Sequence, residues 1–187
     1  MNPAPNLVFI GPTGAGKTSL GRRVAQRLGL EFVDSDQAIE RRTGARVALV
    51  FELEGEAGFR QRESEMIAEL CAGSRRLIAT GAGAVLDPGN RRVMHSRGFV
   101  VHLDIDVEQQ LHRLSRDRSR PLLQAPDRRE RLEAMARQRQ PLYAGLRDLH
   151  FTPARGSAAR VTRDLVAAIR AHWLPGDKET PDANDHG

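Results

Sequence analysis

A glycine-rich segment near the N-terminus has the residue types needed to bind phosphate groups. Its sequence, GPTGAGKT at residues 11–18, matches the pattern G-x-x-x-x-G-K-[ST]. In such a loop the backbone N–H groups turn inward around the phosphates, Lys17 reaches the β- and γ-phosphates, and the Thr18 hydroxyl ligates Mg²⁺. The segment therefore predicts a nucleotide site. The residues expected to contact ATP are Gly14, Ala15, Gly16, Lys17, Thr18 and Ser19.

This loop needs a strand before it and a helix after it, and the periodicity of the sequence predicts both. Residues 7–10 are an apolar run, and Leu20, Val24 and Leu28 recur at helical spacing. Further strands are predicted at 31–33, 77–80, 99–103 and 150–152, with helical patterns between them. Strands that alternate with helices favour a parallel sheet covered on both faces. We therefore expect an α/β fold: three α/β/α layers around a five-stranded parallel sheet.

The length and charge of the chain limit its organisation and its ligands. A length of 187 residues suits one domain, expected at residues 1–174. Residues 175–187 have no apolar face and are expected to be a disordered tail. The tail contains one lysine and four acidic residues, so a net charge of +5 for the chain leaves +8 on residues 1–174. This charge favours anionic ligands.

Other features of the composition exclude several classes of protein. No apolar run approaches the roughly 20 residues of a membrane span, and the N-terminus lacks the pattern of a signal peptide, so we expect a cytoplasmic protein. The single cysteine, Cys71, excludes an internal disulfide and a cysteine-based zinc site. The six histidines show no metal-ligand spacing, and His95, His102, His112 and His150 are scattered, so no histidine metal site is expected. Trp173 is expected to be a packing residue.

Several separated motifs, taken together with the glycine-rich loop, resemble those of the shikimate kinases. They are FVDSD at 32–36, GFRQRE at 58–63, ATGAGAV at 79–85, RPLL at 120–123 and RQPLY at 139–143. The resemblance covers roughly residues 6–173 and implies a P-loop kinase fold like that of the nucleoside monophosphate kinases. It implies Mg²⁺-dependent transfer of phosphate from ATP to the 3-hydroxyl of shikimate, giving shikimate 3-phosphate and ADP on the route to chorismate and the aromatic amino acids. It also implies a monomer without nucleic-acid or membrane partners.

The resemblance assigns roles to two aspartates that follow the second predicted strand. Asp36 becomes the carboxylate that binds and orients the substrate hydroxyl, and with Lys17 and Arg120 it makes up the expected catalytic set. The alternative for Asp36 is N-capping of a helix that begins at Gln37. Asp34 becomes the second contributor to the Mg²⁺ site beside Thr18, through water. Its alternative is a turn residue.

Four arginines also receive roles from the resemblance. Arg60 and Arg139 match the pair that binds the substrate carboxylate, a task suited to the bidentate guanidinium group. Arg120 matches an arginine of a mobile lid, expected at 117–128, that closes over the ATP phosphates. Arg113 matches a residue that stacks on adenine. The substrate-binding region is expected at about 34–62. Asp104, at the end of a predicted strand, resembles a Walker B aspartate, but a turn or capping role is favoured for it.

The sequence departs from the family pattern where three consecutive glycines are usual near the substrate. It has Gly81, Ala82 and Gly83, all of which are expected to contact the substrate. If the central position required a positive φ angle, alanine would cost on the order of 1–2 kcal/mol there. If φ is negative and the Cβ atom points away from the substrate, the change is silent. Three alternatives stay open: a P-loop kinase of another small polyol or hydroxy acid, a non-catalytic nucleotide-binding paralogue, and an arginine-rich nucleic-acid binder. The last is disfavoured because only eight aromatic residues are present, and they do not interleave with the basic ones.

Overall fold

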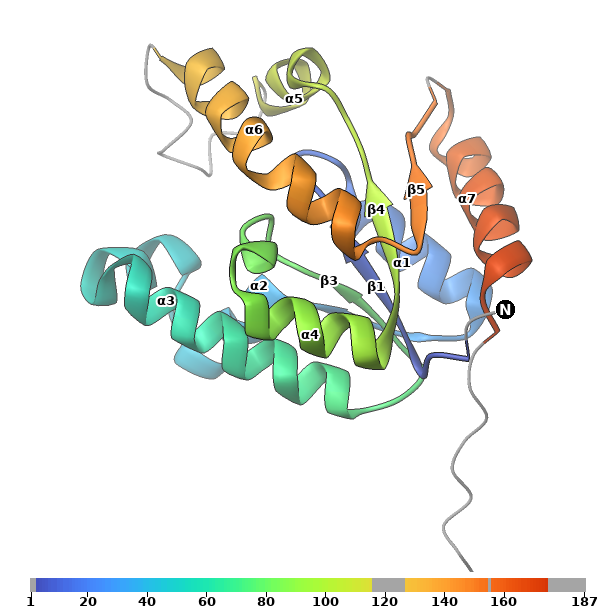
Figure 1. Cartoon of the computed structure of the whole chain (residues 1–187), viewed down its shortest axis with the longest axis horizontal. Coiled ribbons are helices and arrows are strands. Elements are labelled where there is room, and N and C mark those ends of the chain that lie inside the picture. Colours follow the sequence, from blue (N-terminus) through green and yellow to red (C-terminus); the bar gives the residue numbers. More distant parts are fainter. Residues whose placement is uncertain (1–2, 116–126, 155, 175–187) are drawn as a thin grey trace, which may run out of the picture.

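A five-stranded parallel sheet forms the centre of the molecule (Figure 1). The computed structural model describes residues 3–115, 127–154 and 156–174. The sheet order is β2-β3-β1-β4-β5, and every pair of neighbouring strands is parallel. The five predicted strands are all found, and they are β1 (Asn6–Ile10), β2 (Glu31–Asp34), β3 (Arg76–Ala79), β4 (Gly98–Leu103) and β5 (Leu149–Phe151).

Helices connect the strands in the order that the periodicity predicts. They are α1 (Lys17–Leu28), α2 (Ser35–Thr43), α3 (Val47–Ala72), the short 3₁₀ turn η1 (Ala84–Leu86), α4 (Pro88–Arg97), α5 (Val107–Leu114), α6 (Arg128–Leu146) and α7 (Ala158–His172). Side-chain caps start two of these helices. Asp87 caps α4, which has Pro88 in its first turn, and Asp106 with Gln109 forms a capping box at the start of α5.

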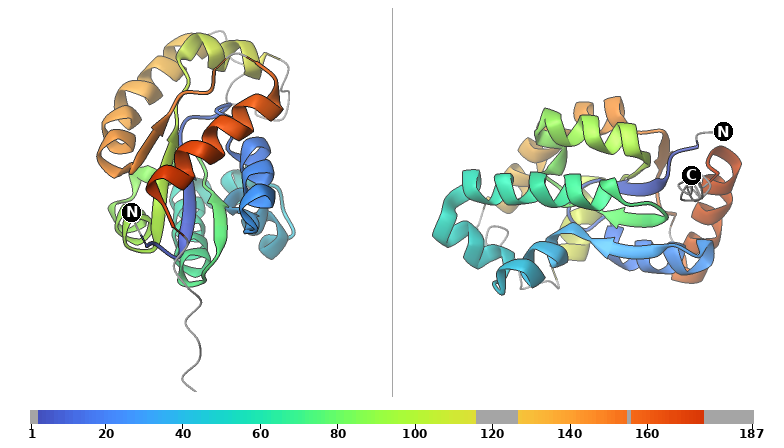
Figure 2. Two further views of the ribbon diagram at one scale, coloured as in Figure 1. Left: turned by 90° about the vertical axis from the view of Figure 1, so that its right-hand side faces the viewer. Right: turned by 90° about the horizontal axis from the view of Figure 1, so that it is seen from below.

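Two apolar layers hold the helices against the sheet. Along β1, Leu7 and Phe9 face one layer while Val8 and Ile10 face the other, because successive side chains of a strand point to opposite faces. The first layer packs against α1 and α7, and the second packs against α3, α4 and α6. Figure 2 shows the sheet between these two helical layers. The predicted three-layer α/β/α architecture with a five-stranded parallel sheet is confirmed.

Two features of the helices go beyond their residue ranges. α3 is not a single straight helix, because Gly55 has φ 71° and ψ −178° and kinks it. Glu54 and Arg62 pair across the kink through two hydrogen bonds of 2.7 Å. The last helix ends at His172, so Trp173 lies beyond it. The indole of Trp173 is buried and donates a hydrogen bond to the Ala4 carbonyl at 2.9 Å, which confirms its packing role.

None of the helices that the structure describes is both long enough and apolar enough to cross a membrane.

Candidate active site

The glycine-rich loop joins β1 to α1 and presents its backbone around Lys17. Gly14 and Gly16 have φ angles of 82° and 91°, a left-handed region that side chains other than glycine adopt at a cost. The ammonium group of Lys17 donates to the carbonyl oxygens of Gly11 at 2.7 Å and Pro12 at 2.9 Å. These bonds hold the positive charge within the loop, at the N-terminus of α1, where the helix dipole also favours anions.

The two predicted metal ligands lie in direct contact. The Thr18 hydroxyl donates to Oδ2 of Asp34 at 2.6 Å, and both side chains are partly buried. Thr18 is in the first turn of α1 and Asp34 ends β2, so the sheet edge brings the two together across sixteen residues. A hydroxyl and a carboxylate are hard oxygen ligands of the kind that Mg²⁺ uses in kinases, so this pair fits a magnesium ion.

Asp34, not Asp36, is the N-cap of α2. Oδ1 of Asp34 accepts hydrogen bonds from the backbone N–H groups of Asp36 at 3.0 Å and Gln37 at 3.2 Å. The capping alternative for Asp36 is therefore wrong, because the helix begins two residues earlier than that alternative assumed. Asp36 instead lies in the first turn of α2 beside the loop that follows β3.

Two glycines of that loop allow three charged side chains to come close to its backbone. A Cβ atom on Gly81 would lie 2.6 Å from Oε1 of Glu63 and 3.0 Å from Oδ1 of Asp36. A Cβ atom on Gly83 would lie 2.5 Å from a terminal nitrogen of Arg60. Any side chain at either position would displace these groups. The structure thus brings Asp36, Arg60, Gly81 and Gly83 together, as predicted, and it adds Glu63.

Glu63 is a charged residue in the interior of this site. Its side chain is 1% exposed and pairs with Arg60 at 2.6 Å. Burial raises the pKa of Glu63, the nearby Arg60 and Arg139 lower it, and the negative charge of Asp36 raises it further. Sequence reasoning assigned Glu63 no role, although its place three residues after Arg60 on one helix is a signal for such a pair.

Tyr143 connects α6 to the glycine loop. Its hydroxyl donates to the Ala82 carbonyl at 2.7 Å, and its ring is 2% exposed. Arg139, one turn earlier on α6, acts electrostatically on both Tyr143 and Glu63. The second predicted carboxylate-binding arginine therefore faces the same group of residues as Arg60. Tyr143 was another residue that sequence reasoning left without a role.

Burial raises the pKa of Tyr143 to about 12, and this shift predicts a measurable alkaline transition. Tyr143 is the single tyrosine of the chain, so the ultraviolet absorbance of phenolate follows it alone. The folded pKa lies above the ordinary value of about 10, so the fold favours the neutral phenol. Its stabilising contribution is complete below pH 10 and is lost as the pH rises towards 12. We expect a phenolate midpoint about two pH units higher in the native protein than in urea.

The alkaline transition can be assigned because few other groups titrate in that range. The chain has two lysines and one cysteine, Cys71, whose pKa burial raises to about 11. Tyr143→Phe removes the absorbance change and serves as the blank. A phenolate midpoint near pH 10 in the native protein would contradict the burial of this hydroxyl against Ala82.

Ala82 fits the backbone without strain. Among the described non-glycine residues only Arg75 has a positive φ angle, so φ of Ala82 is not in the left-handed region. Ala82 is partly buried, and its carbonyl accepts the hydrogen bond from Tyr143. The backbone strain that a positive φ would cause at this position is therefore absent.

Replacing Ala82 by glycine is expected to lower stability and to leave catalysis nearly unchanged. Glycine gains conformational freedom in the unfolded chain, so the free energy of unfolding should fall by about 0.4–1 kcal/mol. Urea unfolding and the KM for the acceptor, measured on both proteins, check this. A more stable Ala82→Gly variant, or one with a much lower KM, would mean that alanine strains the loop.

Arg113 lies against the glycine-rich loop, while the predicted lid is mostly outside the described residues. The Arg113 guanidinium donates to the Gly14 carbonyl at 2.9 Å, and Ser19 donates to the Gly16 carbonyl at 3.3 Å. Arg113 is exposed near the end of α5. Arg120 and residues 117–126 of the predicted lid lie outside the part of the chain that the structure describes.

Asp104 and two histidines form a cluster that the sequence analysis did not predict. Asp104 accepts a hydrogen bond from Gln140 at 3.1 Å and contacts Nε2 of His150 at 2.9 Å, while Nε2 of His102 lies 3.9 Å away. The expected turn or capping role of Asp104 does not describe these contacts. The description of His102 and His150 as scattered was also wrong. They are directly opposite each other in β4 and β5, a pairing that 47 intervening residues conceal.

The fold and the site together define a P-loop kinase with an anion-binding acceptor site. A phosphate-binding loop follows the central strand β1. Carboxylates and arginines converge beside it, where β2 and β3 end. The family model described as shikimate kinase matches residues 13–170. The chain belongs to the shikimate kinase family and is an enzyme of this type.

Individual relatives agree with this membership over nearly the whole chain. A shikimate kinase of Xanthomonas campestris pv. campestris is 53% identical over 173 residues, which are 92% of this chain and 96% of the relative. A shikimate kinase of Stenotrophomonas maltophilia is 51% identical over 177 residues, which are 95% of this chain and 98% of the relative. The solved shikimate kinase of Acinetobacter baumannii in complex with shikimate is similar with a TM-score of 0.86 and 41% identity, covering 91% of this chain and 96% of that one.

Proposed function

We propose that the protein transfers the γ-phosphoryl group of ATP to the 3-hydroxyl of shikimate, giving shikimate 3-phosphate and ADP. The observation that carries the proposal is the convergence of Asp36, Arg60 and Glu63 on the loop at Gly81 and Gly83, beside the phosphate-binding loop. Such a site offers cations for a carboxylate and acceptors for hydroxyl groups, and shikimate has one carboxylate and three hydroxyls. The family membership of the chain supports this assignment.

Arginines hold the carboxylate end of the acceptor in the proposed mechanism. Arg60 keeps a fixed orientation because Glu63 binds one of its terminal nitrogens at 2.6 Å, and its side chain stays one-quarter exposed. Arg139 has a buried Nε atom without a hydrogen-bond partner among the described residues, so a ligand carboxylate would complete its bonding. Two guanidinium groups that bind one carboxylate orient the ring and fix its distance from the phosphates.

Asp36 orients the attacking hydroxyl. It lies one residue after Ser35, whose hydroxyl accepts the N–H of Gly81 at 3.1 Å, so its position relative to the glycine loop is fixed. Phosphoryl transfer proceeds through a loose transition state, so alignment of the hydroxyl is a larger contribution than removal of its proton. Asp36 accepts that proton as the bond to phosphorus forms.

Lys17 and the backbone N–H groups of the loop bind the transferred phosphate and the β-phosphate. Thr18 and Asp34 are the residues that would hold Mg²⁺. When bound, this ion neutralises charge on the phosphate oxygens. In the proposal Arg113 stacks on adenine, and Arg120 closes over the phosphates as part of a lid at 117–128. Action as a monomeric single domain in the cytoplasm, without nucleic-acid or membrane partners, remains a prediction.

A coupled assay of ADP release tests the proposed substrate. Mg·ATP is supplied with shikimate, quinate, gluconate or no acceptor at matched concentrations. Release that depends on shikimate is expected. Release only with quinate or gluconate would identify a kinase of another hydroxy acid, and ATP binding without any release would identify a non-catalytic relative. Ala82, in place of the usual glycine, was the reason to consider another acceptor. Its backbone is not strained, so strain does not favour a different acceptor.

A further inference from the structure

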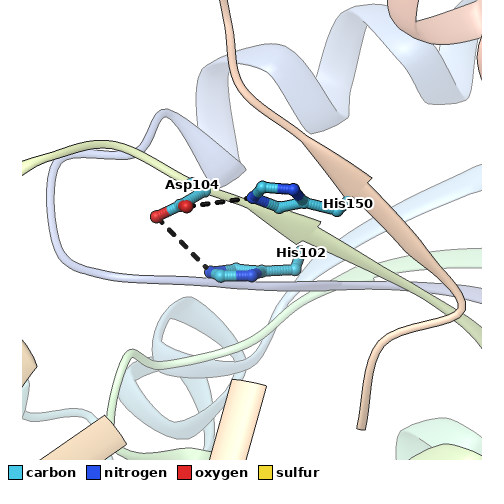
Figure 3. A group of neighbouring side chains, drawn as sticks. All are labelled: His102, Asp104 and His150. Atoms are coloured by element: carbon cyan, nitrogen blue, oxygen red, sulfur yellow. Dashed lines mark hydrogen bonds and ion pairs between the residues drawn. The ribbon is translucent and has the colours of Figure 1, made fainter. Parts of the chain in front are cut away.

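The pairing of β4 with β5 creates a group of potential metal ligands at the edge of the sheet. His102 is opposite His150 in the register, so their side chains lie on the same face. The two rings have centroids 5.4 Å apart, and both turn a nitrogen towards the Asp104 carboxylate (Figure 3). The residues come from the two strands and from the position that directly follows β4.

The distances are close to those of a three-ligand metal site. One potential ligand atom from each of the three side chains lies within 4.8 Å of the others. Bonds of 2.0–2.1 Å to a tetrahedral ion place neighbouring ligand atoms about 3.3 Å apart. Small rotations of His150 and Asp104, which are 42% and 25% exposed, can close this difference because neither side chain is fixed in the core.

The state of His102 provides an independent indication that a ligand is accommodated. Its side chain is completely buried, yet neither ring nitrogen has a hydrogen-bond partner among the described residues. An imidazole buried in this way leaves polar atoms unsatisfied, which is rare in folded proteins. Burial also lowers the pKa of His102 to about 4, so the ring is neutral at pH 7 and has a lone pair available. Tyr143 stacks on the ring and holds its orientation.

The surroundings of the cluster also suit a bound ion. Gln140 donates to Oδ1 of Asp104 at 3.1 Å, which is the kind of outer hydrogen bond that metal-binding carboxylates accept. The exposed edge of His150 leaves a path from solvent and room for water as a fourth ligand. The positive charges of Lys17 and Arg147 lower the pKa of His102, and the negative charge of Asp104 raises it.

We propose that His102, Asp104 and His150 bind one divalent transition metal ion, of which Zn²⁺ is the representative, through two imidazole nitrogens and one carboxylate oxygen. Imidazole favours such ions over Mg²⁺, which takes oxygen ligands and retains its waters. The site is separate from the oxygen pair of Thr18 and Asp34. It requires no participation in phosphoryl transfer, so the proposal does not depend on the identity of the acceptor.

Zn²⁺ titration of the untagged full chain tests the proposal directly. The protein is first treated with a chelator and then titrated calorimetrically in excess Mg²⁺, which occupies oxygen sites. Co²⁺, whose visible spectrum reports imidazole ligation and a four-coordinate geometry, provides a second measurement. We expect one Zn²⁺ per chain, which displaces Co²⁺ and raises the thermal midpoint of unfolding.

Variants of the two partly exposed ligands locate the ion. His150→Ala and Asp104→Asn should each weaken Zn²⁺ binding by at least about ten-fold, the lower limit seen for loss of an outer partner. His95→Ala, on the exposed surface of α4, is the matched control and should bind as the parent does. Circular dichroism verifies that each variant folds. If Asp104→Asn does not fold, Zn²⁺ binding by His150→Ala decides the test. The proposal is overturned if the parent binds no Zn²⁺ in excess Mg²⁺, or if the folded variants bind it as tightly as the parent.

Discussion

Replacing Lys17 by alanine is expected to lower kcat on the order of 10³-fold, the scale of losing a preorganised charged donor at the reacting centre. The Lys17 ammonium is held within the loop by the carbonyl groups of Gly11 and Pro12. No other lysine is present before residue 178 to take its place. The measurement is steady-state ADP release with saturating shikimate and Mg·ATP.

Two further variants separate loss of the ammonium from general damage to α1. Arg23→Ala removes an exposed positive charge from the same helix and should leave kcat unchanged. Lys17→Arg keeps the charge but places a wide planar group in a loop that holds a compact one, so it should not restore activity. Full activity in Lys17→Arg would show that only the charge matters.

Asp36→Asn is expected to lower kcat by about 10²–10⁴-fold, the usual contribution of a positioned acid or base, while ATP affinity is retained. Asparagine has nearly the same shape and can still contact a hydroxyl, but it cannot accept the proton. Because Asp34 caps α2, the change at Asp36 should not unfold that helix. Comparing kcat with the Kd for ATP separates the two effects.

A matched substitution on the opposite face of the sheet controls for the loss of one negative charge. Asp164→Asn on α7 alters an exposed aspartate and should be neutral for both turnover and ATP binding. If Asp36→Asn turned over shikimate at nearly the parental rate, Asp36 would have no role in aligning or deprotonating the hydroxyl. Loss of ATP binding in that variant would instead indicate a role at the phosphates.

The fold could be predicted from local patterns because its elements are short and clearly separated. Each of the first four strands is a short, mostly apolar segment that ends in aspartate or leads into glycine or aspartate within two residues, and helix caps such as Asp106 with Gln109 are local in sequence. The pairing of Thr18 with Asp34 was also predictable, since both follow from the motifs around them. The order of the strands in the sheet, in contrast, was not predicted, because local patterns do not specify which strands are neighbours.

The contacts that could not be predicted join residues that are far apart in the sequence. His102 and His150 meet because of the register between β4 and β5, and no spacing rule expresses that register. The kink at Gly55 could not be distinguished from an ordinary helical glycine, because the residues on either side of it are typical of helices. Glu63 combines a contact that is local in sequence with one that is not. Its pairing with Arg60 followed from helical spacing, but its burial depends on the glycine loop of another element.

The central position of β1 determines when the chain can begin to fold during its synthesis. β1 is the first strand made, it is fully buried, and its two partners are β3 and β4. At about 5–20 residues per second, the 87 residues between Ile10 and Gly98 take roughly 4–17 s to add. During that time the apolar segment NLVFI has at most one of its two neighbours. We therefore expect the newly made N-terminal half to be a substrate for chaperones that bind extended apolar segments, and the complete sheet forms only after most of the polypeptide has been translated.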